Sequence, residues 1–293
     1  MHSLEASLSF RKSHSGMQST YSRLKNKLIF WHPFGCEYAQ SSRWNLLERA
    51  YIRFFGLVDL PTRMRARLII RVLRSIRWKT MLDLGSGTGV YSFYFSRSRD
   101  VHVCGVDICK ARVDECQAMI PKLDRASLDF ITSSRIFETN RFYPDSIDVV
   151  LAIEVLPYLF DIPEGFREIQ QVLHPGGYLI GHVPFQGYCQ SPETVRFDRD
   201  TLARLTKESG LDPISITRVF GGSARFLSWV YAYCARTRLC TAIAFPFLLM
   251  ASLTCGGKNS KGSYCLFIAR KPLHNGDGDP SSNSAHRSPN LKP

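Results

Sequence analysis

The sequence lacks the cysteine spacing of a metal site or of a disulfide framework. Its 293 residues hold nine cysteines, an odd number, and no two of them stand as Cys-x-x-Cys. The group of Cys104, Cys109 and Cys116 has the spacing of neither a zinc site nor a small disulfide-rich domain. Reduced thiols in a cytoplasmic protein are therefore the simplest interpretation, and no metal is expected.

Apolar segments for targeting or for crossing a bilayer are also scarce. The first 30 residues contain no apolar core of a secretory signal peptide. Residues 239–255 form an uncharged run of 17 residues, which is at the lower limit for a transmembrane helix. The sequence therefore predicts a protein that is not secreted. The role of the apolar run at residues 239–255 is considered separately below.

Acidic residues are few outside the middle of the chain. Residues 1–79 hold 15 Lys and Arg against 4 Asp and Glu, and residues 221–262 hold 5 against none. Residues 80–220 hold 14 against 19, although the whole chain has a net charge of +13. Basic flanks around a mildly acidic core favour a polyanionic partner, either anionic lipid head groups or nucleic acid, while a solvated basic helix face is an equally good interpretation.

The most informative stretch runs from residue 80 to residue 107. A short apolar run with Asp83 in it is followed by Gly85, Gly87 and Gly89 at alternate positions. An amphipathic segment comes next, and a second apolar run then ends at Asp107. This order predicts a strand, a tight loop, a helix and a second strand around a small-molecule pocket.

The loop does not have the spacing of a dinucleotide site. A G-x-G-x-x-G loop would need glycine at position 90, where the sequence has Val90. The charge of Asp83 near the loop would repel a pyrophosphate and attract a cationic amino group or a sulfonium. Asp107 stands at the carboxyl end of the second strand, where it can accept hydrogen bonds from a ribose diol.

The pattern Asp83-x-Gly85-x-Gly87-x-Gly89 with Asp107 resembles the cofactor site of class I S-adenosylmethionine-dependent methyltransferases. It is most similar to the branch that methylates quinones, other small molecules and lipids. The resemblance extends over residues 68–220 and 263–272, and its second signature is a helix, a Pro-Gly-Gly turn and a strand that end at Val183.

The resemblance implies S-adenosylmethionine as the cofactor. The family usually has an acid after the third strand to hold the adenine amino group, and Ser134 stands there with only a hydroxyl. The residues that the resemblance assigns to cofactor binding are Asp83, Gly85, Ser86, Gly87, Gly89, Asp107, Ile108 and Ser134.

The fold that the resemblance implies is α/β and Rossmann-like. It is a doubly wound, mostly parallel sheet of seven strands with an antiparallel seventh strand, an N-terminal helical lid and a helical insertion between strands six and seven. The parts expected along the chain are a basic, weakly ordered N-terminus at 1–40, helices at 41–79, the methyltransferase core at 80–220, a hydrophobic insertion at 221–262, the last core strand at 263–271 and a disordered tail at 272–293.

The insertion must return to the side of the sheet from which it leaves, because strands six and seven lie in one sheet. A helical hairpin satisfies this constraint, either on the face of a bilayer or packed over the active site. The sequence leaves both possibilities open.

Catalysis by such an enzyme needs positioning and a desolvated site more than an acid–base triad. If the acceptor must lose a proton, we expect Glu154 or His182 to be the base, because both stand near carboxyl ends of strands that border the pocket. An ordinary histidine pKa near 6.5 suits this role, whereas Glu154 would need a pKa raised by burial beside Tyr158. The alternatives to a catalytic role are structural: Glu154 would cap the next segment, and His182 would form hydrogen bonds within its strand.

The sequence therefore favours an enzyme that methylates a hydrophobic small-molecule or lipid-like acceptor. We expect it to be cytoplasmic, with possible peripheral contact to an anionic membrane surface. A nucleic-acid-directed methyltransferase is one alternative, although no Asn/Asp-Pro-Pro-aromatic motif follows strand four. A non-catalytic, membrane-associated adaptor is another, which the intact glycine loop and its two acids oppose.

Overall fold

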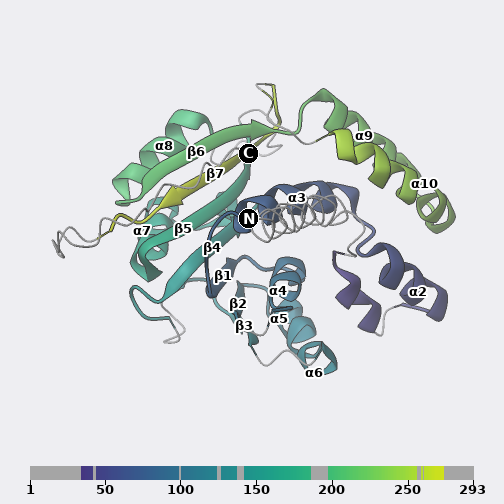
Figure 1. The fold of residues 1–293 in the computed structure, drawn as a ribbon, viewed down its shortest axis with the longest axis horizontal. Coiled ribbons are helices and arrows are strands. Elements are labelled where there is room, and N and C mark those ends of the chain that lie inside the picture. Colours follow the sequence, from purple (N-terminus) through teal and green to yellow (C-terminus); the bar gives the residue numbers. More distant parts are fainter. Residues whose placement is uncertain are drawn as a thin grey trace, which may run out of the picture.

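The chain forms one seven-stranded sheet with helices on both faces (Figure 1). The computed structural model describes residues 34–41, 44–98, 100–123, 127–136, 142–185, 197–255, 259 and 261–273. Most of the N-terminal segment predicted to be weakly ordered lies outside the described residues, and so does the predicted tail beyond residue 273.

The sheet has the strand order β3-β2-β1-β4-β5-β7-β6, and its neighbours are parallel except where β7 pairs with β5 and β6. The strands are β1 (Thr80–Leu84), β2 (His102–Asp107), β3 (Leu128–Thr132), β4 (Ile147–Ile153), β5 (Leu173–Pro184), β6 (Asp212–Val219) and β7 (Tyr264–Arg270). This confirms the predicted doubly wound sheet with an antiparallel seventh strand. The order reverses between β1 and β4, and ligands of such sheets bind at the carboxyl ends beside that point.

Successive side chains of the strands point to opposite faces and build two apolar clusters. In β4, Val149 and Leu151 belong to one cluster, and Val150 and Ala152 belong to the other. Helices α3, α4, α5 and α10 contribute to the first cluster, while α7 and α8 contribute to the second. The helices are η1 (Cys36–Gln40), α2 (Leu46–Phe55), α3 (Leu60–Leu73), α4 (Val90–Phe95), α5 (Lys110–Gln117), α6 (Ile120–Leu123), η3 (Leu156–Tyr158), α7 (Ile162–Val172), α8 (Arg199–Glu208), α9 (Gly222–Cys234), α10 (Arg238–Ala251) and η4 (Ser252–Thr254).

Two predicted boundaries were wrong. The sequence predicts that Asp200 starts a helix, but α8 begins at Arg199 because Asp198 caps it and accepts a hydrogen bond from the Thr201 N–H over 2.7 Å. The fifth strand was expected to begin at Tyr178, after the Pro-Gly-Gly turn. It begins at Leu173, which pairs with Ile147 of β4. The register then shifts, because the next pair is Val149 with Tyr178, and the extra residues bulge on β5.

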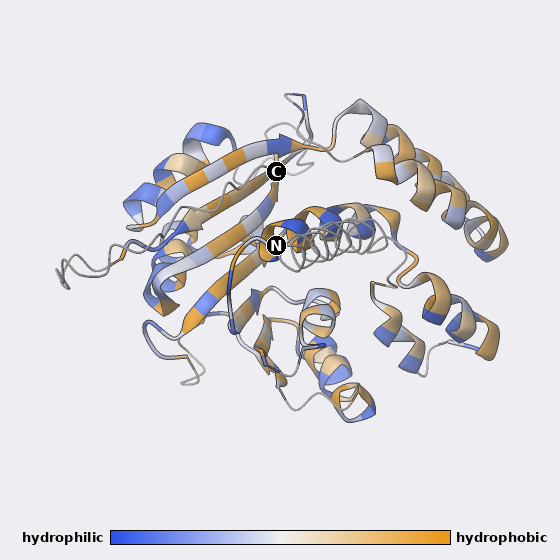
Figure 2. Cartoon of the chain, viewed as in Figure 1, coloured by the Kyte–Doolittle hydropathy of each residue, from blue (hydrophilic) through white to orange (hydrophobic). Residues whose placement is uncertain are grey.

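The insertion between β6 and β7 contains α9 and α10, which pack against each other beside α3 (Figure 1). Two tyrosines tie it to the N-terminal helices: the Tyr231 hydroxyl donates to the Val58 carbonyl over 2.6 Å, and the Tyr51 hydroxyl donates to the Ala242 carbonyl over 2.7 Å. Hydrophobic residues occur along both helices of the hairpin (Figure 2). No helix in the described part of the chain has the length and apolarity needed to cross a bilayer.

The contact between β5 and β7 generates a stability prediction. A Cβ on Gly181 would lie 2.0 Å from a ring carbon of Phe267, which is fully buried on the opposite strand. We expect Gly181→Ala to lower the free energy of unfolding by about 1–3 kcal/mol through overpacking. Urea unfolding measures this. The matched control is Gly222→Ala at the start of α9, where a Cβ meets no described atom within 4 Å and alanine should be neutral or slightly stabilising. Equal stabilities of the two variants would contradict the packing argument.

Candidate active site

The glycine loop connects β1 to α4 at the carboxyl edge of the sheet. Gly85, Gly87 and Gly89 all have left-handed backbone conformations, with φ of 69°, 56° and 75°. A Cβ on Gly85 would collide with Val155, and one on Gly89 would collide with Phe130. The first and third glycines are therefore required by packing within the protein.

Gly87 differs from its neighbours because its missing side chain faces open space. The nearest described atom to a Cβ built there is a guanidinium nitrogen of Arg112, 3.5 Å away. The Gly87 N–H donates to a carboxylate oxygen of Asp107 over 2.7 Å, and the Cys109 N–H donates to the other oxygen over 2.8 Å. Asp107 thus holds the loop in shape, and at Gly87 the left-handed backbone, more than packing, favours glycine. Ile108, next in sequence, is exposed at the same edge.

Asp83 lies beneath this loop and is only 1% exposed. The Ser92 hydroxyl of α4 donates to its carboxylate over 2.6 Å. Burial raises the pKa of Asp83 from 3.8 to about 6, while the hydrogen bonds from Ser92 act in the opposite direction. The site therefore holds a carboxylate whose charge is poorly compensated, which a nearby cation would stabilise.

The two serines assigned to cofactor binding lie in different surroundings. The Ser86 hydroxyl is buried without a hydrogen-bond partner among the described residues and lies close to Gly105 of β2. Ser134 is exposed after the end of β3, on the same side of the sheet as Asp107. Of these two serines, therefore, only Ser134 has a side chain that is exposed at the carboxyl edge of the sheet.

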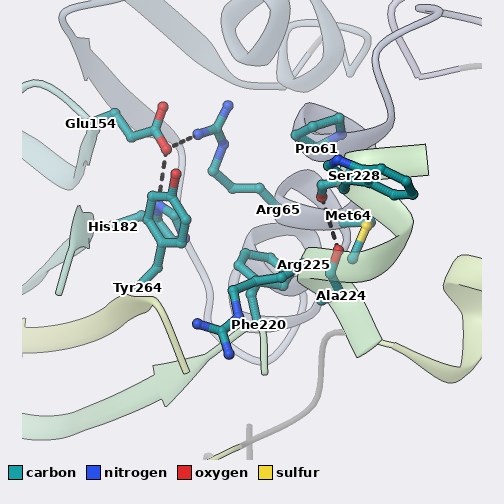
Figure 3. Close-up of a pocket in the computed structure, with 11 residues that line it drawn as sticks. Pro61, Met64, Arg65, Glu154, His182, Phe220, Ala224, Arg225, Ser228 and Tyr264 are labelled. Carbon is teal, nitrogen blue, oxygen red and sulfur yellow. Dashed lines mark hydrogen bonds and ion pairs between the residues drawn. The ribbon is translucent and has the colours of Figure 1, made fainter. Parts of the chain in front are cut away.

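A cavity of about 340 Å³ lies between α3, α9 and the adjoining ends of β4, β5 and β7 (Figure 3). Its wall is mostly apolar and aromatic, with a few polar groups at one side. It is lined by Pro61, Met64, Phe220, Ala224, Trp229 and Tyr264, together with Arg65, Glu154, His182, Arg225 and Ser228. Such a lining suits a hydrophobic small molecule with one polar centre.

Three polar residues meet on the core side of this cavity. Arg65 of α3 forms an ion pair with Glu154, and its Nε donates to the Tyr91 hydroxyl of α4 over 3.2 Å. Glu154 follows β4 in a left-handed conformation, with φ of 58°, and its N–H donates to the His182 carbonyl over 2.7 Å. One of its carboxylate oxygens is 3.7 Å from the Nδ1 of His182 (Figure 3).

His182 is enclosed by rings. Its imidazole stacks on Tyr264 with centroids 4.9 Å apart and meets Phe220 edge-on at 5.8 Å. Neither ring nitrogen has a hydrogen-bond partner among the described residues, although the side chain is only 1% exposed. Burial lowers the pKa of His182 well below 6.5, and the positive charge of Arg65 acts in the same direction. The imidazole is therefore neutral at neutral pH.

The structure brings the predicted pair Glu154 and His182 together and changes part of the reasoning about them. Tyr158 is 82% exposed, so it does not bury Glu154 as the sequence suggested. Two further residues at this site, Arg65 and Tyr264, were not predicted from the sequence. Arg65 is one of several arginines in α3, and helical spacing does not say which of them turns inward.

Known proteins similar to this chain are methyltransferases. Residues 82–181 match the family model described as a methyltransferase domain. An O-methyltransferase of Aspergillus nomiae is 26% identical over 175 residues, which cover 55% of this chain and 77% of that protein. Phosphoethanolamine N-methyltransferase 1 of Arabidopsis thaliana is 32% identical over 120 residues, which cover 39% of this chain but only 22% of that protein.

A solved structure shows the same fold. Phosphoethanolamine N-methyltransferase 2 of Haemonchus contortus superposes with a TM-score of 0.52 at 17% identity, covering 82% of this chain and 60% of that one. The fold, the glycine loop and the two acids define an α/β domain that binds a nucleoside at the carboxyl edge of its sheet. The methyltransferase-domain match covers about a third of this chain and, together with these features, supports a class I S-adenosylmethionine-dependent methyltransferase. It is a methyltransferase, and S-adenosylmethionine is its cofactor.

The buried carboxylate of Asp83 generates a pH prediction. Its pKa is raised in the folded state, so between about pH 4 and pH 6 the native protein holds a proton that the unfolded chain has lost. The stability of wild type should therefore fall relative to Asp83→Asn as the pH rises through this window. We expect the difference in unfolding free energy to change by roughly 2 kcal/mol in favour of the variant between pH 4 and pH 7.

Urea unfolding without cofactor at several pH values measures this difference. The control is Asp161→Asn, which changes an exposed aspartate that caps α7 and can be replaced there by asparagine. The difference between Asp161→Asn and wild type is the baseline for the comparison. A pH-independent difference for Asp83→Asn would show that the folded protein does not raise this pKa.

Proposed function

We propose that this methyltransferase transfers a methyl group to a hydroxyl oxygen of a hydrophobic small-molecule or lipid-like acceptor held in the cavity beside His182. The observation that carries the proposal is the buried, neutral imidazole with no hydrogen-bond partner in the described chain, at the polar side of a ring-lined cavity. A hydroxyl must lose its proton when it is methylated, and such an imidazole can accept that proton.

The residues at the loop fit the cofactor. When bound, S-adenosylmethionine supplies a methyl group already activated on a sulfonium. Asp83 would hold its ammonium, because an ammonium stabilises a buried carboxylate. Asp107 would accept hydrogen bonds from the ribose, with Ile108 and Ser134 towards the adenine. Gly85, Ser86, Gly87 and Gly89 would shape the loop, and Gly87 is the one that leaves room above it.

The acceptor cavity and the loop share a wall. Val155, which would collide with a side chain at Gly85, directly follows Glu154 of the cavity. In α4, Ser92 contacts Asp83 and the preceding Tyr91 contacts Arg65. A ligand beside His182 therefore lies next to the loop.

Between the two predicted bases, the geometry favours His182. Arg65 already neutralises Glu154, and a carboxylate that gained a proton would lose this ion pair. Glu154 instead supports the reaction through the imidazole, because a proton on Nδ1 of His182 would face its carboxylate and leave Nε2 as the acceptor. His182 is thus the proposed base, and Glu154 a positioning residue.

The relatives support oxygen as the methylated atom without deciding it. The Aspergillus protein is an O-methyltransferase, whereas the Arabidopsis protein is an N-methyltransferase that this chain matches over a small part of its length. An unprotonated amine would not need a base before methylation, so a buried neutral histidine is better explained by a hydroxyl. The expected cytoplasmic position, with contact to membranes, remains part of the proposal.

Gly87→Val tests the cofactor site. Valine adds a branched side chain to a left-handed residue, where β-branched residues are strongly disfavoured, and fills the space above the loop. We expect calorimetry to detect binding of S-adenosylmethionine to wild type and at least about tenfold weaker binding to the variant. Gly222→Ala, far from the loop in sequence and in helix α9, should bind like wild type. Equal affinities for wild type and Gly87→Val would overturn the assignment of the loop.

His182→Asn tests the base once an acceptor is in hand. Because burial lowers the pKa of His182, the rate for wild type should stay level from pH 8 down to at least pH 6.5, instead of falling there as for an ordinary histidine. The variant should lose about a hundredfold in kcat with unchanged cofactor binding. Glu154→Gln should lose less, since it keeps the imidazole.

The matched control is His174→Asn, because His174 is an exposed histidine of the same strand, outside the cavity. It should turn over like wild type at every pH. If His182→Asn also turned over like wild type, positioning alone would account for catalysis and His182 would not be the base.

A further inference from the structure

The outer face of the α9–α10 hairpin exposes large apolar side chains on two adjacent helices. On α9 these are Phe226, Trp229 and Tyr233, which fall on one side of the helix and stack in a row with centroids 6.2 Å and 6.4 Å apart. The three rings are 62–65% exposed. A contiguous exposed apolar surface of this kind marks an interaction site.

Helix α10 is apolar on both of its sides. Its inner side buries Phe245, Leu248 and Leu249 in the core cluster that also contains α3. Its outer side exposes Leu239, Ile243, Phe247 and Met250, each between 49% and 74% exposed. A helix that is hydrophobic all round is normally enclosed on all sides. The outer side of α10 therefore lacks its covering in the described part of the chain.

The charges around this face are of one sign. Residues 221–262 contain no Asp or Glu, while Arg225 lies in α9, Arg238 begins α10 and Arg236 lies in the turn between the two helices. Arg238 pairs with Glu48 of α2, which leaves the face with a net positive charge. Aromatic and aliphatic side chains with a basic border fit the head-group region of an anionic bilayer, where the rings lie at the interface and each arginine attracts anionic lipid.

We infer that this outer face, made by Phe226, Trp229, Tyr233, Ile243 and Phe247 with Arg236, docks the enzyme on an anionic membrane surface. The consequence of docking for catalysis rests on the proposed function. Trp229 belongs both to the exposed row and to the wall of the proposed acceptor cavity, so the docked face adjoins that cavity. Docking on this face brings the cavity beside the acyl region of the bilayer. An amphiphilic acceptor dissolved in the membrane then reaches His182 without crossing water.

Vesicle flotation of the full-length chain tests the docking without any acceptor or cofactor. Wild type should float with vesicles of phosphatidylcholine and phosphatidylglycerol at low salt, and much less with phosphatidylcholine alone. The double variant Ile243→Ser, Phe247→Ser should bind at least about tenfold more weakly, and Arg236→Gln about fivefold more weakly to the anionic vesicles. Tyr143→Ser with Ile214→Ser, which removes two exposed apolar side chains elsewhere, should float like wild type.

Bromine-labelled lipids locate the face at the bilayer. Tryptophan fluorescence of vesicle-bound wild type should be quenched, and most of the quenching should be absent in Trp229→Phe. The docking is overturned if wild type stays in solution with anionic vesicles, if the double variant floats as well as wild type, or if Trp229 is not quenched. It is also overturned if wild type is a lipid-free dimer that the double variant makes monomeric, because a second copy would then cover the face.

Calorimetry with S-adenosylmethionine on the same preparations separates this result from the proposed function. A chain that binds the cofactor but no vesicles contradicts the docking alone. A chain that floats but binds no cofactor contradicts the proposed use of the loop alone.

Discussion

The ion pair between Arg65 and Glu154 connects the helices that precede the sheet to the carboxyl edge, at which we propose that the chemistry takes place. It holds α3 over the end of β4 and closes the cavity above His182. Both partners are held elsewhere as well, Arg65 by Tyr91 and Glu154 through its backbone bond to the His182 carbonyl. The pair is partly exposed, with side-chain exposures of 14% for Arg65 and 36% for Glu154, so it fixes this geometry together with those two hydrogen bonds and not by itself. The left-handed backbone of Glu154 is tolerated because these contacts fix its position.

The same short helix serves both halves of the site. Ser92 of α4 donates to the buried carboxylate under the loop, while the neighbouring Tyr91 accepts from the arginine of the cavity. Adjacent helical residues point in directions about 100° apart, so one turn of helix can contact two separate groups. A change in the position of α4 on cofactor binding would therefore reach Arg65, and through it the ion pair beside the imidazole. The glycine loop and the cavity therefore both contact this one helix.

Much of the architecture could be read from the sequence, because buried parallel strands are short apolar runs and the loop is marked by alternate glycines between two acids. Glu154 and His182 could be proposed because strand ends share one edge. Their partners could not be predicted. Arg65 is one of several arginines on α3, and Tyr264 reaches His182 only through the antiparallel register of β5 and β7. The pKa of His182 could not be predicted either, since it depends on rings brought together from three distant segments.

The position of β7 has a consequence for how the chain folds during synthesis. This strand is made last among the seven, yet it lies inside the sheet, between β5 and β6. Both of these strands, and the apolar α9–α10 hairpin, leave the ribosome before their central partner exists. Until β7 is inserted, β5 and β6 each present an unpaired edge. The nascent chain therefore passes through a stage in which its apolar α9–α10 helices and two unpaired strand edges are exposed together. A chaperone or a membrane surface would first contact the chain at this stage.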